Sequence, residues 1–197
     1  MNKLSFRPSR AGFGYFPVRA AFAVPKALRF APLVAILFAV LFVLSSCGKK
    51  AEARFPPLTL AEANAEAVWK RIKVDGAYDS WAFWPGHEGE RDGQAPHGPY
   101  HRIYVNADLF AGLPSPTRTA PEGSIIVKEN MNADRKVTAI TLMAKIKGFD
   151  PANGDWFWAR YDLAGKSNAS GKVNGCINCH AGMKDNDFVI VRALDAR

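Results

Sequence analysis

The chain has 197 residues, a formal net charge of +8 and three cysteines. Residues 1–46 hold six of the 26 basic residues and no acidic residue, so the other 151 residues carry 20 basic against 18 acidic ones. The excess positive charge therefore belongs mostly to the leader and gives no argument for nucleic-acid binding. A length of 151 residues is enough for one domain with its own core.

The leader has the pattern of an export signal. Its basic stretch is followed by the apolar run 31–44, which is too short to span a bilayer comfortably and suits the core of a signal peptide. The next residues, Leu44–Cys47, resemble the lipobox of bacterial lipoproteins, in which the cysteine is lipidated. A plain signal peptide or an uncleaved anchor is the alternative. We predict a signal peptide at 1–46, lipidation of Cys47, a tether at 47–57 and a lipid-anchored, periplasmic protein.

The predicted domain covers residues 58–197 and begins with a helix. Thr59 and Glu62 have the spacing of a capping box, and apolar residues recur at helical spacing over 60–73. The following segment, 75–99, is rich in glycine, proline, tryptophan and histidine, and reads as loop.

Strand patterns then dominate. Strands are predicted at 100–105, 123–130, 137–149 and 155–162, with a helical turn at 106–111 and a hairpin turn at 132–136. Successive strands joined by short turns favour antiparallel pairing. The expected fold class is α+β: a mainly antiparallel β-sheet with a few flanking helices. A cysteine and histidine motif lies at the C-terminal end of this domain.

Near the C-terminus lies the sequence Cys176-Ile-Asn-Cys179-His180. Two thiols at this spacing can add to the vinyl groups of a haem, and the following histidine can bind its iron, which is the pattern of covalent haem c attachment. A redox dithiol is the first alternative, but no βαβ unit surrounds the motif. A zinc site is the second, and it would need further ligands. The remaining cysteine and histidines are Cys47, His87, His97 and His101.

The position of the motif excludes the commoner cytochromes. Class I cytochromes c are helical, carry the motif near the start of the chain and supply a methionine ligand well downstream. Here the one later methionine, Met183, is too close in sequence to reach the opposite haem face easily. Helical-bundle cytochromes c′ would show four long amphipathic helices, which this chain lacks.

The domain resembles the cytochrome P-460 family. The blocks that carry the resemblance are 97–106, 121–130, 147–162 and 170–180, in this order. The resemblance implies an antiparallel sheet with a few helices, a homodimer, and one haem c whose iron keeps an open sixth position. It also implies oxidation of hydroxylamine, with a periplasmic cytochrome as the electron acceptor.

In founding members of that family a lysine is bonded to a meso carbon of the porphyrin, and the matching residue here is Lys128. From the residues alone, a lysine at the end of an apolar strand would be a solvated or snorkelling side chain. Strand alternation puts Ile126, Lys128 and Asn130 on one face, with Val127 and Glu129 on the other. If Lys128 touches the haem, Glu129 should point away from it.

The polar groups around the open position are harder to predict. Hydroxylamine oxidation needs a proton acceptor. Some relatives offer a carboxylate just before the first haem cysteine, but residues 168–174 contain no acid. Arg160, on the same strand face as Trp156 and Trp158, is a candidate hydrogen-bond donor, with a surface or ion-paired arginine as the alternative.

The other histidines and aromatic residues have plainer interpretations. His97 or His101 could be a sixth ligand in an electron carrier with a closed iron, and His87 is expected to be exposed. Large aromatic side chains are expected in the core and in the haem-pocket wall: Trp81, Phe83, Trp84, Phe149, Trp156, Phe157 and Trp158. Three functions stay open: hydroxylamine oxidation, binding of nitric oxide or carbon monoxide as in the related cytochromes c′-beta, and electron transfer.

Overall fold

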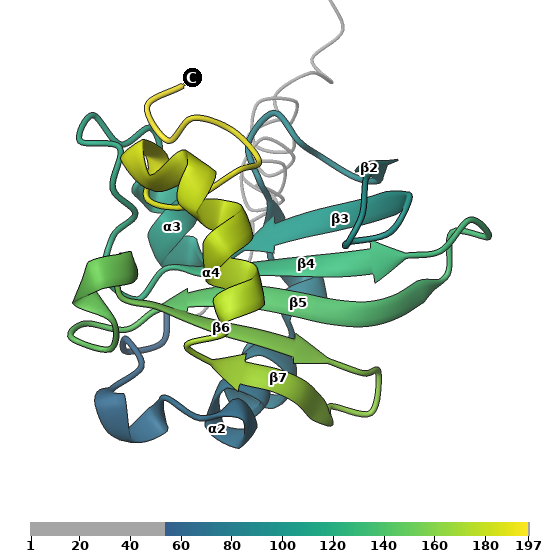
Figure 1. Ribbon diagram of the computed structural model, residues 1–197, viewed down its shortest axis with the longest axis horizontal. Helices are drawn as coiled ribbons and strands as arrows, with labels where there is room; N and C mark the ends of the chain where they lie inside the picture. The colour runs from purple at the N-terminus through teal and green to yellow at the C-terminus, as the bar shows by residue number, and fades with distance from the viewer. Residues whose placement is uncertain (1–53, 197) are drawn as a thin grey trace, which may run out of the picture. The chain divides into compact units, whose positions relative to one another are not determined.

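The fold is built on one antiparallel sheet, seen in the computed structural model, which describes residues 54–196. The predicted signal peptide and Cys47 lie outside the described residues. Within them the sheet has seven strands: six follow the order β1-β3-β4-β5-β6-β7, and the short β2 pairs with the first two residues of β3 (Figure 1). Every pairing is antiparallel, so the predicted α+β class is confirmed.

The four predicted strands form the centre of this sheet. These four are β3, β4, β5 and β6. All seven strands are β1 (Ala82–Phe83), β2 (Arg91–Asp92), β3 (Tyr100–Val105), β4 (Ile125–Met131), β5 (Val137–Lys145), β6 (Trp156–Tyr161) and β7 (Ser167–Gly171). The prediction for β3 is correct to the residue, and those for β4, β5 and β6 differ by a few residues at their ends. Strand β7 was missed because its sequence, SNASG, contains no large apolar residue to show the alternation on which strand prediction depends.

The helical elements are short. They are η1 (Leu60–Glu62), α2 (Ala65–Trp69), η2 (Lys70–Asp75), η3 (Tyr78–Ser80), α3 (Ala107–Ala111), η4 (Pro151–Asn153), α4 (Asn174–His180) and η5 (Ala181–Asn186). The predicted turn at 106–111 corresponds to α3, which Asn106 caps by accepting a hydrogen bond from the Leu109 amide.

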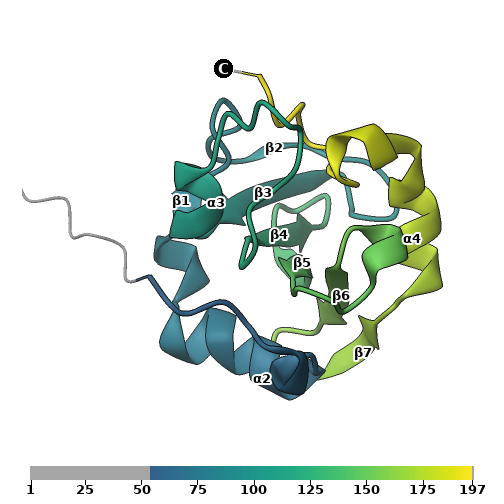
Figure 2. The same cartoon turned by 90° about the vertical axis from the view of Figure 1, so that its left-hand side faces the viewer.

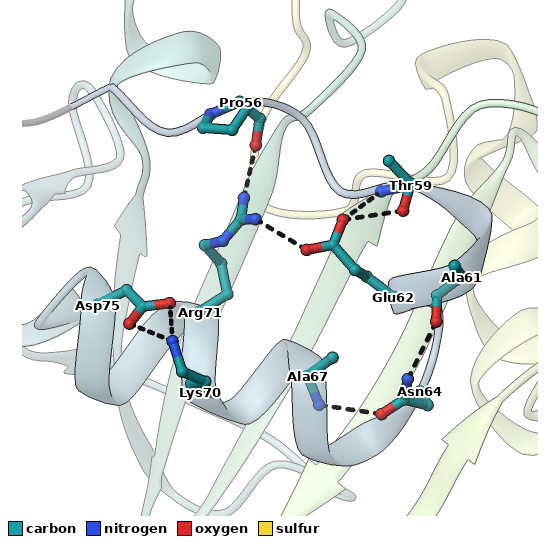
Figure 3. Close-up of polar contacts among 9 residues, drawn as sticks. All are labelled: Pro56, Thr59, Ala61, Glu62, Asn64, Ala67, Lys70, Arg71 and Asp75. Atoms are coloured by element: carbon teal, nitrogen blue, oxygen red, sulfur yellow. Dashed lines mark hydrogen bonds and ion pairs between the residues drawn. The ribbon is translucent and has the colours of Figure 1, made fainter.

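The predicted helix at 60–73 is wrong at its start. The Thr59 amide does donate to the Glu62 carboxylate at 2.9 Å, as in a capping box, but only a 3₁₀ turn follows (Figure 3). The chain starts again at Asn64, whose side chain accepts from the Ala67 amide at 2.9 Å. Asparagine is a strong N-cap, so α2 begins at Ala65 and then continues into the π-helical turn η2.

Two apolar layers cover the two faces of the sheet. On one face, Val68 and Ile72 from the α2–η2 segment pack with Val127, Leu142 and Phe157. On the other, Ile177 of α4 belongs to a second buried cluster that includes these residues of the sheet: Ile103, Ile126, Met143, Trp156 and Trp158. Figures 1 and 2 show α4 standing across this second face, away from α2.

The register of β4 decides which side chains meet α4. Lys128 is paired with Ile103 on β3 and with Thr141 on β5. Its neighbour Glu129 lies on the opposite face and is buried, where its carboxylate accepts hydrogen bonds from the Tyr78 hydroxyl and an Arg102 guanidinium nitrogen, both at 3.2 Å. The predicted alternation along this strand is therefore confirmed, with Lys128 on the α4 side of the sheet.

Candidate haem site

Helix α4 carries the whole Cys-x-x-Cys-His motif. On an α-helix, residues three and four apart lie on one face, so Cys176, Cys179 and His180 are neighbours. Ile177 between them is buried and fixes α4 against the sheet. Cys176 is half-buried, Cys179 is exposed and both thiols are free. Burial, with a further contribution from Cys179, raises the pKa of the Cys176 thiol.

A cavity of about 720 Å³ lies between α4 and the sheet. This volume is in the range of sites that enclose a large organic ligand. Apolar walls come from β3, β4, β5 and β6 and from residues 189–191. All the predicted haem-site residues line it, together with the three other histidines: Lys128, Arg160, Cys176, Cys179, His180, His87, His97 and His101.

His180 is held in one tautomer. Its Nδ1 lies 2.8 Å from the Phe188 carbonyl oxygen, and a carbonyl can only accept, so Nδ1 carries the proton. The lone pair is then on Nε2, the nitrogen that a metal would take. Burial lowers the pKa of the ring below its usual value, although the hydrogen bond to Phe188 opposes this. The Trp158 ring packs against the imidazole with centroids 4.7 Å apart. His180 is thus prepared as a neutral axial ligand.

The carbonyl that holds His180 is itself held by Asp187. Asp187 and Phe188 both have left-handed backbone angles, with φ of 52° and 63°. The Asp187 carboxylate accepts from Lys145 Nζ at 2.6 Å and from the Ala120 amide at 2.9 Å. Its carbonyl accepts from Trp156 Nε1 at 2.8 Å. These contacts offset the cost of the unusual backbone and aim the Phe188 carbonyl at His180.

We expect Asp187→Ala to destabilise the domain by about 3–5 kcal/mol, because it leaves the Lys145 charge buried without its partner. The side chains of this pair are only 12% and 8% exposed. Urea unfolding would measure the loss. The matched control is Glu122→Ala, which breaks the exposed Lys147–Glu122 pair and should cost about 0–1 kcal/mol. Equal losses in the two variants would contradict this role of Asp187.

Lys128 presents its amine to the cavity. Burial lowers the pKa of Lys128 to about 8, and no described carboxylate pairs with it. The residues alone suggested that the Lys128 side chain would be solvated at the end of its strand, and the structure does not show this. At pH 7 a pKa near 8 leaves roughly a tenth of the amine neutral, about 300-fold more than for an ordinary lysine. Only the neutral form is a nucleophile.

Arg160 also lies at the cavity, opposite Thr141 in the β5–β6 ladder. It forms no ion pair with any described residue, so the alternative of an ion-paired arginine is not supported, and its side chain is half-buried. Asp92 is the one carboxylate among the described lining residues, and it is exposed. The absence of an acid before Cys176 is therefore not compensated by a buried carboxylate from elsewhere in the described chain.

The three other histidines do not behave alike. His97 Nδ1 lies 2.9 Å from Asn130 Oδ1, and its ring centroid is 6.5 Å from that of His180. His101 is buried, and its Nε2 lies 2.7 Å from Nε2 of His87. The expectation that His87 is exposed was wrong: it is half-buried in the cavity wall. Nothing in the sequence signals this contact, because it joins a loop to a strand 14 residues away.

The large aromatic residues divide between the two layers. Of the seven predicted, Trp158 alone lines the cavity. Trp84 and Trp156 belong to the cluster on the α4 face, whereas Trp81 and Phe157, with Phe83 and Phe149 packed against them, belong to the α2 face. The prediction of core residues is therefore confirmed, and that of a pocket wall holds for one of them.

The residues fit a haem. The cavity is mostly apolar, the free thiols lie on the helix that borders it, and His180 lines it with its Nε2 free to bind a metal. Trp158 Nε1 is buried without a hydrogen-bond partner among the described residues, so an acceptor on the ligand would satisfy it. Residues 54–196 contain no group of three or more His, Cys, Asp or Glu placed to hold a metal ion directly.

A family model described as Cytochrome P460 matches residues 76–191, which is 116 of the 197 residues. The chain belongs to the cytochrome P460 family. The match contains every predicted haem-site residue, and membership makes this protein a haem-containing cytochrome. No curated protein matches the chain. Among the described residues, no helix has the length and apolar character needed to cross a bilayer.

Proposed function

We propose that this cytochrome P460 oxidises hydroxylamine on a single haem c and passes the electrons to a periplasmic cytochrome. The observation that carries the proposal is Lys128. Its amine, with a pKa lowered to about 8 by burial, opens into the same cavity as Cys176, Cys179 and His180. A gas-binding or electron-transfer cytochrome has no evident need for a buried lysine without a counter-ion, and burying such a charge is costly.

In this proposal Cys176 and Cys179 form thioether bonds to the haem and His180 Nε2 binds its iron. The haem supplies an electron acceptor with an open position for the substrate nitrogen. The chain supplies the rest: the Phe188 carbonyl fixes the His180 tautomer, the apolar walls exclude water, and Arg160 offers hydrogen bonds to a polar substrate.

Lys128 is proposed to bond to a meso carbon of the porphyrin. Its Nζ–H and the meso C–H are replaced by one C–N bond, which releases two protons and two electrons, so a two-electron oxidant such as a peroxide is needed. The neutral amine is the reacting species, because only it has a lone pair. The bond would also remove a buried positive charge from the cavity.

The substrate chemistry sets a proton requirement. Oxidation of hydroxylamine to nitric oxide releases three electrons and three protons. The electrons leave one at a time to the acceptor cytochrome, and the protons must leave through groups on the protein. Hydroxylamine is small and polar, and a cavity with Lys128, Arg160 and three histidines in an apolar wall suits such a molecule better than a large organic substrate.

The decisive experiment is turnover of hydroxylamine with an artificial one-electron acceptor. We expect the purified protein to reduce the acceptor and to form nitrogen oxides, at a rate proportional to its haem content. Tight binding of nitric oxide or carbon monoxide without turnover of hydroxylamine would contradict the proposed enzymatic function. It would favour the gas-binding function of the cytochromes c′-beta.

One observation favours electron transfer as the second candidate. The His97 ring lies 6.5 Å from the His180 ring, and the two planes are nearly perpendicular at 88°. His97 could therefore close the iron. An oxidised protein that is low-spin and closed to added ligands would support this function.

We also propose that the mature protein begins at lipidated Cys47, faces the periplasm and forms a homodimer. The leader pattern and the family resemblance support these points. Intact mass should show cleavage before Cys47 and added acyl chains, whereas a Cys47→Ala protein that stays fully bound to the membrane would contradict the anchor. Light scattering of the detergent-solubilised protein would test the dimer.

A further inference from the structure

His101 and His87 form an isolated pair in the cavity wall. His101 lies on β3 and is 6% exposed, and its Nε2 is 2.7 Å from Nε2 of His87. His87 comes from the loop between β1 and β2 and is half-buried, so it is the outer member. The rings are nearly parallel, at 11°, with centroids 5.0 Å apart. At this distance one Nε2 carries a proton and the other accepts it.

The other ring nitrogen of His101 has no partner. Its Nδ1 is buried and forms no hydrogen bond with any described residue. It lies beside Gly93, where a Cβ atom would approach it to 3.0 Å, and Gly93 also lines the cavity. Because Gly93 has no side chain, its backbone packs directly against this nitrogen at the edge of the cavity. A buried polar atom without a protein partner is a usual position for a bound water, and such a water would join Nδ1 to a substrate in the cavity.

We infer that His101 and His87 are a proton relay, which carries protons from the substrate cavity to solvent. This inference rests on the proposed hydroxylamine oxidation. His101 takes a proton on Nδ1 and gives the proton on its Nε2 to Nε2 of His87, which releases the proton on its Nδ1 to water. One proton enters and one leaves, and each ring is left in its other tautomer, so both rings must recover their first tautomers before the next proton passes. The electrons depart separately to the acceptor cytochrome. The pair replaces the carboxylate that residues 168–174 lack.

The surrounding charges favour neutral rings that are ready to accept. Burial, and then the Lys128 charge, lower the pKa of His101 to about 4, with smaller contributions from His87 and His97. For His87, burial, Arg91 and Lys128 lower the pKa, and Glu88 opposes them. When Lys128 loses its charge on bonding to the porphyrin, the pKa of both rings must rise. The relay therefore gains basicity only in the finished site.

Cyanide binding tests the relay without turnover. Hydrogen cyanide must give up its proton when it binds ferric haem as the anion, so a base in the cavity speeds binding. We expect His101→Gln and His87→Gln to slow cyanide association by about 10-fold or more, since positioned general bases contribute roughly 10²–10⁴-fold. Glutamine keeps the approximate size and polarity of the side chain but does not pass a proton on.

Two controls separate proton transfer from damage to the site. Carbon monoxide binds ferrous haem without releasing a proton, so its association rate should not change in either variant. Lys166→Gln changes an exposed residue of the β6–β7 turn and leaves both rings and the charges around them in place, so it should bind cyanide like the wild type. A hindered base such as 2,6-lutidine, added to His87→Ala, should restore fast cyanide binding, because it can accept protons at the outer position but is too crowded at its nitrogen to bind the iron.

The outcomes test the proton relay separately from the proposed oxidation of hydroxylamine. Slow cyanide binding and slow hydroxylamine turnover in both variants, with rescue of His87→Ala by the hindered base, support the relay. Unchanged cyanide rates overturn it even if the wild type oxidises hydroxylamine, and so does an iron closed to cyanide. Slow cyanide binding in the variants of a protein that never oxidises hydroxylamine would retain the proton path and reject the proposed function.

Discussion

Replacing Lys128 with alanine should abolish hydroxylamine oxidation and give the reduced haem the spectrum of an ordinary c-type cytochrome. A C–N bond at a meso carbon distorts the porphyrin and alters its conjugation, so the wild-type absorption band should lie well to the red. Thioether bonds alter only the vinyl groups and cannot produce this shift. The measurement is the visible spectrum of reduced protein, followed by turnover with an artificial acceptor.

Two variants distinguish the effect of the bond between Lys128 and the porphyrin from the effect of the lysine's positive charge. Lys128→Arg keeps a cation in the cavity but has no primary amine, so it should behave like Lys128→Ala in both measurements. Lys136→Ala removes an exposed lysine of the β4–β5 hairpin and should leave spectrum and turnover unchanged. A protease digest of the wild type should yield the peptide that contains Lys128 joined through haem to the Cys176–His180 peptide. A free Lys128 peptide and an ordinary wild-type spectrum would reject the oxidase.

The rate of bond formation should depend on pH in a definite direction. The amine reacts in its neutral form, and burial holds the pKa of Lys128 at about 8. Protonation therefore protects the amine below this pH. In freshly haem-loaded protein the red-shifted band should develop about tenfold faster per pH unit up to pH ~8 and then level off. An ordinary exposed lysine would show the same rise continuing to pH ~10.

The centre of the sheet was predictable because its strands carry strong local patterns. β3, β4, β5 and β6 are rich in β-branched and aromatic residues, and segments with glycine, proline or asparagine separate them. The segment between β3 and β4 is long and also contains α3. The edge strand β7 has no such pattern and exists because it pairs with β6. The first helix was misplaced because two capping signals, Thr59 and Asn64, compete within five residues and the second is the one that α2 uses.

The site was predictable only where its chemistry is local in sequence. Cys176, Cys179 and His180 form one motif, and alternation along one strand placed Lys128 and Glu129 on opposite faces. By contrast, the Phe188 carbonyl that fixes His180 depends on the Asp187–Lys145 pair between distant elements. The His87–His101 contact depends on how a loop closes over β3. Interactions of this kind follow from the tertiary structure, and single-sequence patterns do not encode them.

Replacing both Cys176 and Cys179 with alanine should abolish covalent haem attachment. The wild type, once matured with a haem-attachment system, denatured and extracted with acidified organic solvent, should keep all of its colour in the protein. Each thiol can form one thioether bond, so either single variant should retain haem through the other cysteine. In the double variant the fit of the cavity and the His180 bond are the only attachments left, and neither survives denaturation.

The single variants should also differ in how well they mature. Cys176 is half-buried at the cavity with a raised thiol pKa, whereas Cys179 is exposed. Attachment through Cys176 alone should therefore need a haem that is already seated, and Cys179→Ala should mature more slowly than Cys176→Ala. The amount of haem bound to each single variant is measured as the ratio of iron to protein. Haem that extracts freely from the wild type, or zinc in place of iron, would contradict the assignment of this motif and with it the position of His180 as the axial ligand.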